Sequence, residues 1–494
     1  MHIYNTHSKR KEVFQPLQEG VVKMYICGPT VYNFLHIGNF RGLIFFNTVA
    51  YWFKHLGFKV EFVYNYTDID DKIIQASIEE KKTPLQLSEH YIQEFEKDKK
   101  QLKLSFQDIQ HPKASEHIIN MITFIQNLEK KGFVYVLNAS LYFSVKNYLN
   151  YGQLSGRNLE DSQMGTRAKT EEGKKHPADF VLWKASKDGE PSWDYKSLKD
   201  NKIYPGRPGW HIECSAMSKA LLGEELDIHG GGIDLLFPHH ENEIAQSESC
   251  NDKTFAKYWM HNNMINFGDK KMSKSLGNII LGKDFIKEHT GEVLKFLMLS
   301  VHYRSELNFN QKSIASATYN TAKFYSVLNK ANILLEGKKG DSNLLSKEDK
   351  EFFATTEKNI TEAFYDDFNT PMVFAELFKI LNAFHVKTSE GKLKEKQAYA
   401  NACKTLLVKT GKFLSLFQET PSSFLTELDN LLLKEQNLNP KDIDQLVEQR
   451  TTARKNKDFS LSDNLRKELL QKGIQVQDLA NGTSIWEVNK NSAK

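Results

Sequence analysis

Lys271 and Lys274 lie three residues apart in the run Lys-Met-Ser-Lys-Ser, with Gly268 before the run and Gly277 after it. A lysine ammonium is a compact charge on a flexible stem, so it can follow phosphate oxygens as charge moves along them. Two such charges on a glycine-flanked loop suggest a clamp for a triphosphate whose leaving group gains negative charge. A solvated basic loop explains the pentapeptide equally well, so a second element must decide.

That second element is a strand, turn and helix near the N-terminus. The alternation of Val22–Cys27 predicts a strand, Gly28-Pro29-Thr30 breaks it, and helical apolar spacing runs from His36 to about His55. This order forms a common phosphate site, because free backbone N–H groups and the helix dipole favour an anion. His36 and Asn39 at the helix start can donate to phosphate, and Gly38 lets a base or ribose approach the backbone.

The pair of elements is much more specific than either alone. With His36-Ile-Gly-Asn39 after a first strand and Lys271–Ser275 far downstream, the chain resembles the class I aminoacyl-tRNA synthetases. The resemblance implies a Rossmann-like core that joins an amino acid to Mg-ATP and then to tRNA. It implies that His36, Gly38, Asn39 and Lys274 bind ATP, and that His36, Asn39, Lys271 and Lys274 are catalytic. Many class members have histidine in place of Asn39; asparagine keeps a donor but carries no charge.

A second group of side chains has the chemistry of a metal site. Cys27, Cys214, His239 and Glu243 offer two thiolates, an imidazole and a carboxylate, which are donors that zinc prefers. Pro238 suits the first turn of a helix, which would place His239 and Glu243 on one face. Cys27 as a small buried hydrophobe and a simple His–Glu hydrogen bond are the alternatives. Spacing across strands does not show that the four converge.

Six segments resemble one family within the class, the cysteinyl-tRNA synthetases. They are 25–32, 65–72, 209–217, 237–247, 366–371 and 449–458. The resemblance spans the whole chain. It implies ATP-dependent ligation of L-cysteine to tRNA(Cys) through a cysteinyl-adenylate.

The resemblance also assigns the metal and substrate residues. It implies one Zn²⁺ per chain, held by Cys27, Cys214, His239 and Glu243. The amino-acid pocket would be lined by Trp210 and His229, with Thr67 nearby. A hydrophobic pocket separates close neighbours by only ~1–3 kcal/mol, whereas zinc binds a thiolate far better than a hydroxyl. We expect Glu243 to be the weakest ligand, yielding or allowing five-coordination when the substrate thiolate arrives.

The expected fold class is α/β, with a Rossmann-like parallel-sheet core, an insertion, a helical bundle and a small C-terminal domain. At 494 residues the chain has room for all of these. The predicted boundaries are 1–116 for the first half of the core, 117–204 for the insertion, 205–310 for the second half, 311–410 for a tRNA-binding helical bundle and 411–494 for an anticodon-binding domain.

Local patterns add finer predictions. A second strand, Lys59–Tyr66, would deliver Thr67 and Asp68 to the carboxyl edge of a parallel sheet, although either could instead cap a helix. Gly230–Gly232 suggests a tight turn. Thr370-Pro371 has the pattern of an N-cap and first helical residue.

The C-terminal segment carries a cluster of basic residues at Arg450, Arg454, Lys455 and Lys457, followed by Trp486. Such a pattern would suit an RNA loop, where bases stack on rings and phosphates meet arginine. A solvated helical face is the commoner explanation.

The composition indicates the cellular compartment in which the protein works. The net charge of +4 neither requires nor excludes nucleic acid. The four cysteines form no CxxC pair, which favours a reducing compartment over a disulfide framework. There is no apolar signal core and no run of ~20 apolar residues, so we expect a cytoplasmic protein without a membrane span. The expected partners are tRNA(Cys), ATP and L-cysteine, and a monomer is expected.

Three other functions fit parts of the pattern. A ligase that passes cysteine to a small amine could use the same catalytic half, but it would not need the helical, basic C-terminal part. A non-catalytic zinc-containing RNA-binding protein would not need both nucleotide motifs. A simple nucleotidyltransferase would not explain the zinc donors.

Overall fold

The computed structural model describes residues 1–157, 172–267, 270–271, 280–478 and 483–489. Lys274 lies outside the described residues, and Lys271 is described through its backbone alone. Predictions about the chemistry of these two side chains therefore remain predictions.

The core is a five-stranded parallel sheet in the order β12-β11-β3-β4-β5. Its strands are β3 (Val21–Ile26), β4 (Lys59–Tyr64), β5 (Ile109–Gln110), β11 (Leu226–Gly232) and β12 (Ala256–Asn262). Strands β3 and β11 lie side by side, and Ile228 pairs with Met24. In the sequence, 199 residues separate the end of β3 at Ile26 from the start of β11 at Leu226. The chain runs outward from β3 on one side and from β11 on the other. Such a switch point leaves a crevice at the carboxyl ends of the strands, where ligands bind in folds of this type.

Helix α1 (Ile37–His55) connects β3 to β4, as the sequence predicts. His36 is its N-cap, and the helix is buried on most sides, which explains why its sequence is apolar over more than one face. The predicted strands are confirmed as β3 and β4, each ending one or two residues earlier than expected. The α/β class and the parallel sheet are therefore confirmed.

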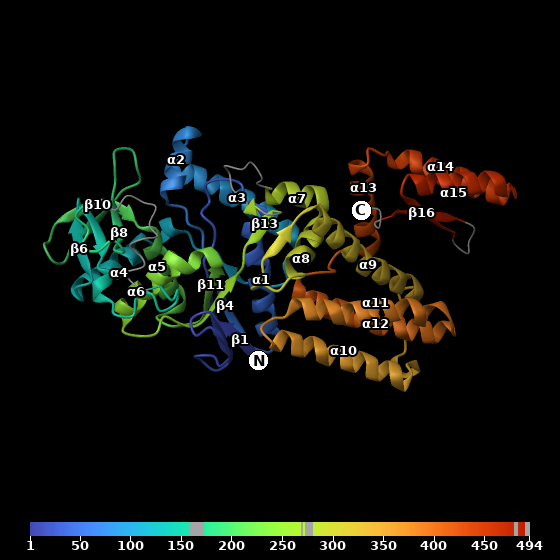
Figure 1. The fold of residues 1–494 in the computed structure, drawn as a ribbon, viewed down its shortest axis with the longest axis horizontal. Coiled ribbons are helices and arrows are strands. Elements are labelled where there is room, and N and C mark those ends of the chain that lie inside the picture. Colours follow the sequence, from blue (N-terminus) through green and yellow to red (C-terminus); the bar gives the residue numbers. More distant parts are fainter. Residues whose placement is uncertain (158–171, 268–269, 272–279, 479–482, 490–494) are drawn as a thin grey trace.

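A second sheet, antiparallel and in the order β6-β7-β8-β10-β9, lies mostly in the predicted insertion 117–204, and its strand β10 extends four residues past that boundary. Its strands are β6 (Val134–Leu137), β7 (Ser140–Phe143), β8 (Phe180–Ala185), β9 (Trp193–Lys196) and β10 (Ile203–Pro208), with helix α4 (Ile118–Lys130) beside it. Figure 1 shows this sheet at one end of the molecule, beside α4 and α5 (Trp210–Leu222). Strand β10 leads directly into α5, and buried side chains of the two sheets belong to one hydrophobic cluster.

The remaining elements of the catalytic half surround the core sheet. They are β1 (His2–Asn5), β2 (Arg10–Val13), α2 (Asp71–Glu79), α3 (Pro84–Leu102), α6 (Glu241–Asn251), β13 (Ile265–Phe267), β14 (Lys270–Lys271), α7 (Gly282–His289), α8 (Gly291–Leu299) and β15 (Leu307–Phe309). Short helical turns cover Ala114–His117, Val145–Asn147, Ile233–Leu235 and Leu236–His240.

The C-terminal part is mainly helical, as expected. Long helices α9 (Gln311–Leu335), α10 (Lys347–Tyr365), α11 (Thr370–Ser389) and α12 (Leu393–Leu414) form a bundle, with a short turn at Ser342–Leu344. Then follow α13 (Pro421–Glu435), α14 (Pro440–Lys455), α15 (Phe459–Gln471), β16 (Ile474–Asp478) and β17 (Ser484–Val488). In Figure 1, α14, α15 and β16 lie at the end of the molecule away from the insertion sheet.

Three local predictions need correction. Gly230–Gly232 is the end of β11 rather than a tight turn, and a Cβ on Gly230 would lie 2.1 Å from the carbonyl oxygen of Met260. The N-cap of α11 is Asn369, one residue before the predicted Thr370. Pro238 lies in the turn that precedes α6, because that helix begins at Glu241.

One residue of the basic C-terminal cluster, Arg450, differs from the RNA-binding interpretation. Arg450 is buried and pairs with Asp478 at 2.7 Å, and Arg454 pairs with the same carboxylate at 2.9 Å. The indole of Trp486 donates to Asp444 at 2.8 Å. Arg450 therefore joins α14 to β16, and its guanidinium is not available to a nucleic acid.

Across the part of the chain that the structure describes, every helix is too short or too polar to span a bilayer.

Candidate active site and metal centre

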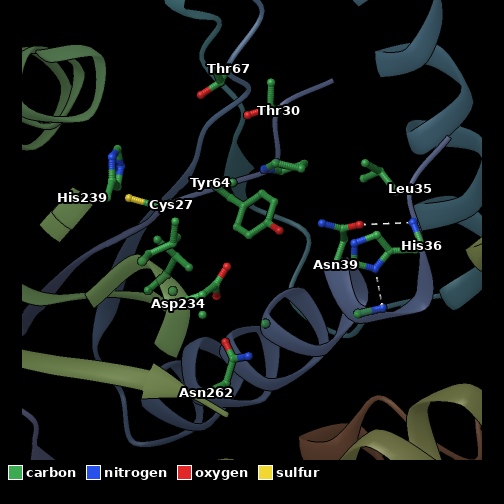
Figure 2. A pocket seen from close by; sticks show the side chains of 18 of the residues that line it. Cys27, Thr30, Leu35, His36, Asn39, Tyr64, Thr67, Asp234, His239 and Asn262 are labelled. Carbon is green, nitrogen blue, oxygen red and sulfur yellow. Dashed lines mark hydrogen bonds between the residues drawn. The ribbon is translucent and has the colours of Figure 1, made fainter. Parts of the chain in front are cut away.

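A cavity of about 460 Å³ opens at the carboxyl ends of β3, β4 and β11. Figure 2 shows Cys27 and His239 at one end of it, and His36 and Asn39 at the other. Its lining includes Gly38, Thr67, Trp210 and Cys214. The cavity therefore joins the predicted phosphate-binding residues to the predicted metal donors.

The start of α1 is ordered by its own side chains. The backbone N–H of Gly38 donates to His36 Nδ1 at 3.1 Å, and the backbone N–H of His36 donates to Asn39 Oδ1 at 3.1 Å. Because Nδ1 of His36 accepts, a neutral ring carries its proton on Nε2. A Cβ on Gly38 would lie 2.8 Å from His36 Nδ1, so a larger residue here would displace the His36 ring from its hydrogen bond. The side-chain amide of Asn39 keeps its NH₂ group for a ligand.

The chain that follows the Lys271–Ser275 motif is attached to this same helix start. The N–H of Ile37 donates to Ile280 O at 3.0 Å, and the N–H of Gly282 donates to Leu35 O at 2.8 Å. Before the motif, β14 pairs with β13, which lies next to the cavity through Ile265. Both chain ends that carry the motif are therefore held beside the cavity.

The four predicted metal donors converge. Cys27 Sγ lies 3.6 Å from Cys214 Sγ and 3.4 Å from Glu243 Oε1, and His239 Nε2 lies 3.0 Å from the same oxygen. All four side chains are buried, and their donor atoms lie within 4.8 Å of one another. The sequence could name these residues but could not show that they meet.

These distances match the edges of a zinc tetrahedron. Two sulfurs, each ~2.3 Å from zinc, would be ~3.8 Å apart, and a sulfur–oxygen edge would be ~3.6 Å. The observed values of 3.6 and 3.4 Å are close to both. A second group of donors, Cys27, His229, His240 and Glu243, shares two of these residues. The first group contains both thiols and so suits zinc better.

The electrostatics of the donor group also fit a bound cation. Burial lowers the pKa of His239, but Glu243 and Cys214 outweigh burial and raise that pKa to about 10. Burial likewise opposes ionisation of Glu243, yet His229 and His239 hold its pKa well below the usual range. Burial raises the pKa of Cys214, but hydrogen bonds from Cys27 and His239 bring it to about 6. The donors thus favour a positive charge between them.

His229 lies behind the donor group and does not line the cavity. Its Nε2 lies 2.9 Å from Glu243 Oε2, and its Nδ1 donates to the carbonyl of Tyr25 at 2.6 Å. It therefore holds the oxygen of Glu243 that does not face Cys27. His239 is held similarly, since its Nδ1 lies 2.9 Å from His211 Nδ1.

The other two residues implied for the substrate do line the cavity. Trp210 is the first residue of α5 and stacks on the imidazole of His239, with ring centroids 4.3 Å apart. Thr67 follows β4 and its backbone pairs with that of Pro29 and Val31. Asp68, by contrast, accepts from the backbone N–H of Ser115 at 2.9 Å and is buried in the structure.

The cavity also contains residues that sequence reasoning did not select. Asp234, Asn262 and Lys72 line it. Asp234 and Lys72 each follow a strand end, β11 and β4 respectively, within about eight residues of the strand. The rule that ligands meet the carboxyl ends of parallel strands could have identified both.

The fold and the two nucleotide elements define a class I aminoacyl-tRNA synthetase. Residues 13–319 match the family model "tRNA synthetases class I (C) catalytic domain", and residues 359–418 match a "DALR domain". A methionyl-tRNA synthetase structure from Mycobacterium tuberculosis, bound by methionyl-adenylate, covers 80% of this chain and 92% of its own, with a TM-score of 0.60 and 12% identity. At that identity the likeness shows the fold alone.

Full-length relatives narrow the class to one family. A "Cysteine--tRNA ligase" of Bdellovibrio bacteriovorus is 45% identical, covering 99% of this chain and 100% of its own. One of Clostridioides difficile is 42% identical, again over 99% of this chain and 100% of its own. The chain belongs to the cysteine-tRNA ligase family.

Proposed function

We propose that this enzyme ligates L-cysteine to tRNA(Cys) in two steps, through a cysteinyl-adenylate. The observation that carries the proposal is the single cavity that holds both the start of α1 and a complete set of zinc donors. The first element suits the phosphates of ATP, and the second suits a thiol substrate. Family membership supports both assignments.

In the first step, a carboxylate oxygen of cysteine attacks the α-phosphorus of ATP and pyrophosphate leaves. Such reactions depend on positioning and on stabilising charge, because the protein forms no covalent bond. His36 and the NH₂ group of Asn39 would donate to phosphate oxygens at the start of α1, where the helix dipole also favours an anion. Lys271 and Lys274 would neutralise the departing pyrophosphate. We expect ATP to enter with Mg²⁺.

The carboxylate of Asp234 is suited to the ribose hydroxyls of ATP, since it lines the same cavity just beyond β11. The terminal ribose of tRNA would then accept the cysteinyl group from the adenylate. The helical C-terminal part, with its DALR domain, is the expected tRNA-binding region. The four cysteines are free thiols, which supports a cytoplasmic location.

Selection of cysteine is the role that we assign to the metal centre. Zinc held by Cys27, Cys214, His239 and Glu243 supplies a Lewis acid that prefers a soft thiolate to the hydroxyl of serine. Trp210 and Thr67 border the space where the substrate would lie. Because His229 holds Oε2 of Glu243, this carboxylate presents Oε1 to the donor group. Oε1 is therefore the oxygen of Glu243 that would be available to the metal, and we expect Glu243 to be the most easily displaced ligand.

The proposed function predicts a strong, zinc-dependent preference for cysteine over serine. We expect kcat/KM for cysteine in ATP–pyrophosphate exchange to exceed that for serine by ~10⁴-fold or more, as in sites built to bind a specific substrate group. Removal of zinc by a chelator should abolish cysteine activation, and added zinc should restore it. Charging of tRNA(Cys) should follow the same pattern. Full activity in metal-free protein would contradict the proposal, and transfer of cysteine only to a small amine would favour the alternative ligase.

Replacement of His229 by asparagine tests the support of Glu243. The asparagine amide can still donate to the Tyr25 carbonyl, as His229 Nδ1 does, but it is too short to reach Glu243. We expect zinc affinity to fall about 10- to 100-fold, as is usual when the hydrogen bond behind a metal ligand is lost. Competition with a chromogenic chelator measures the affinity. His385→Asn on α11 is the control, and equal affinities in the two variants would be evidence against this role.

A further inference from the structure

Lys72 contributes a positive charge to the catalytic cavity that the two nucleotide motifs do not account for. It lies in the first turn of α2, the helix that follows β4, and it lines the same cavity as His36, Gly38 and Asn39. Its ammonium lies 5.8 Å from the ring centroid of Tyr32, another residue of the cavity wall. Lys72 therefore faces the space in which ATP and cysteine would meet.

The two aspartates before Lys72 do not neutralise it. Asp70 is the N-cap of α2, and its carboxylate accepts from the backbone N–H of Lys72 at 2.8 Å. The carboxylate of Asp71 is bound by Lys184 at 2.8 Å and by Arg207. Among the described residues no carboxylate forms an ion pair with the Lys72 ammonium within 4.0 Å, so its charge remains available to a ligand.

The start of α2 is also held firmly. Arg207 on β10 is buried, and it bridges Asp71 to Glu190, whose carboxylate lies 3.3 Å from Nε. Lys184 comes from the neighbouring strand β8. The insertion sheet thus fixes the first turn of α2, and a fixed support keeps a charged side chain near its productive position.

We propose that Lys72 is a further catalytic residue, which binds the triphosphate of ATP and stabilises the charge that develops in adenylate formation. In that step a cysteine carboxylate oxygen forms a bond to the α-phosphorus, and the bond from that phosphorus to the bridging oxygen breaks. The electron pair leaves on pyrophosphate, and no proton is transferred. A nearby ammonium stabilises the departing anion more than the ground state, so its contribution appears in kcat. This inference rests on the proposed function.

The test compares Lys72→Met, Lys72→Arg and a control, Lys100→Ala, in cysteine-dependent ATP–pyrophosphate exchange. Lys100 is an exposed lysine of α3 outside the cavity lining. We expect Lys72→Met to lower kcat about 10²-fold with the KM for cysteine changed less than ~2-fold. Lys72→Arg should recover part of the rate, and Lys100→Ala should equal the unmodified enzyme. Zinc content and thermal unfolding show whether each variant is folded.

The exchange reaction contains no tRNA, so it separates the two anions that Lys72 could serve. If Lys72→Met exchanges normally and only transfer to tRNA slows, the lysine serves a tRNA phosphate and the proposal is wrong. If Lys72→Met is misfolded or lacks zinc, the Lys72→Gln variant decides, because it also removes the charge. Unchanged kcat and an unchanged KM for ATP in folded, zinc-containing Lys72→Gln would overturn the proposal. Absence of cysteine-dependent exchange in the unmodified enzyme would contradict the proposed function itself.

Discussion

Replacement of Cys214 by serine is expected to remove the bound zinc and to lower cysteine-dependent ATP–pyrophosphate exchange by about 10³-fold or more. A serine hydroxyl is a poor zinc ligand, because it does not lose its proton as a thiol does. The side chain is buried between Cys27 and Asn65, and without it the remaining donors contain only one thiol. The loss should be large because the metal both completes the site and selects the substrate, and sites built for one substrate group discriminate by ~10⁴-fold or more.

Elemental analysis and exchange kinetics on the same preparations measure this effect. Cys250→Ser is the matched control: Cys250 is a buried free thiol on α6, the helix that carries Glu243, but it is not one of the metal donors. We expect that variant to keep one zinc per chain and near-normal exchange. Thermal unfolding should show that both variants are folded. Normal zinc content and exchange in Cys214→Ser would refute the metal centre described above.

Replacement of Lys274 by alanine is expected to lower kcat for cysteine activation about 10²- to 10³-fold while leaving the KM for cysteine nearly unchanged. Removing one donor from a site that stabilises a developing anion typically costs this much. The physical basis is the location of the motif between β14 and Ile280, which is bonded to Ile37 at the start of α1. Because the described chain on both sides of the segment lies beside the cavity, we predict that Lys274 acts on the departing pyrophosphate.

Steady-state ATP–pyrophosphate exchange over a range of cysteine concentrations tests the prediction. Lys287→Ala, which removes an exposed lysine from α7 beyond the motif, is the control and should be unaffected. If kcat/KM for cysteine fell by the same factor but only because KM for cysteine rose, Lys274 would have a role in binding alone. Unchanged exchange would show that Lys274 does not act on the triphosphate.

Cys214→Ser and Lys274→Ala should also lose different properties of the enzyme. Lys274→Ala should retain zinc and its preference for cysteine over serine, because Cys27 and His239 lie at the end of the cavity opposite His36 and Asn39. Cys214→Ser should retain ATP binding, because the start of α1 does not depend on the metal. A variant that lost both properties would show that the two ends of the cavity depend on each other.

Local sequence determined the elements that carry the chemistry. The alternation of Val22–Cys27, the apolar spacing after His36 and the strand formers of Lys59–Tyr64 each describe interactions between near neighbours, and each element forms where the pattern predicts it. The two nucleotide motifs and the types of the four metal donors are likewise readable from the chain. The two motifs carried the resemblance to the class of enzyme, and six longer segments carried the resemblance that named its amino acid.

Other features depended on contacts between distant segments. Cys27 and Cys214 meet because Cys27 follows β3 and α5 packs against β4, the neighbour of β3, an arrangement that no local pattern encodes. The same long-range order places Gly230 in a strand rather than in a turn. It buries Arg450 against Asp478, which turns a candidate RNA contact into an ion pair within the fold.

The sequence by itself therefore determined which elements form, which residues could bind phosphate and zinc, and to which family the chain belongs. Only the tertiary structure decided that Cys27, Cys214, His239 and Glu243 converge, that His229 lies behind Glu243, and that Lys72 faces the cavity. The physical reason is that helix and strand patterns reflect neighbours along the chain, whereas a site at a switch point is set by the order of strands in the sheet.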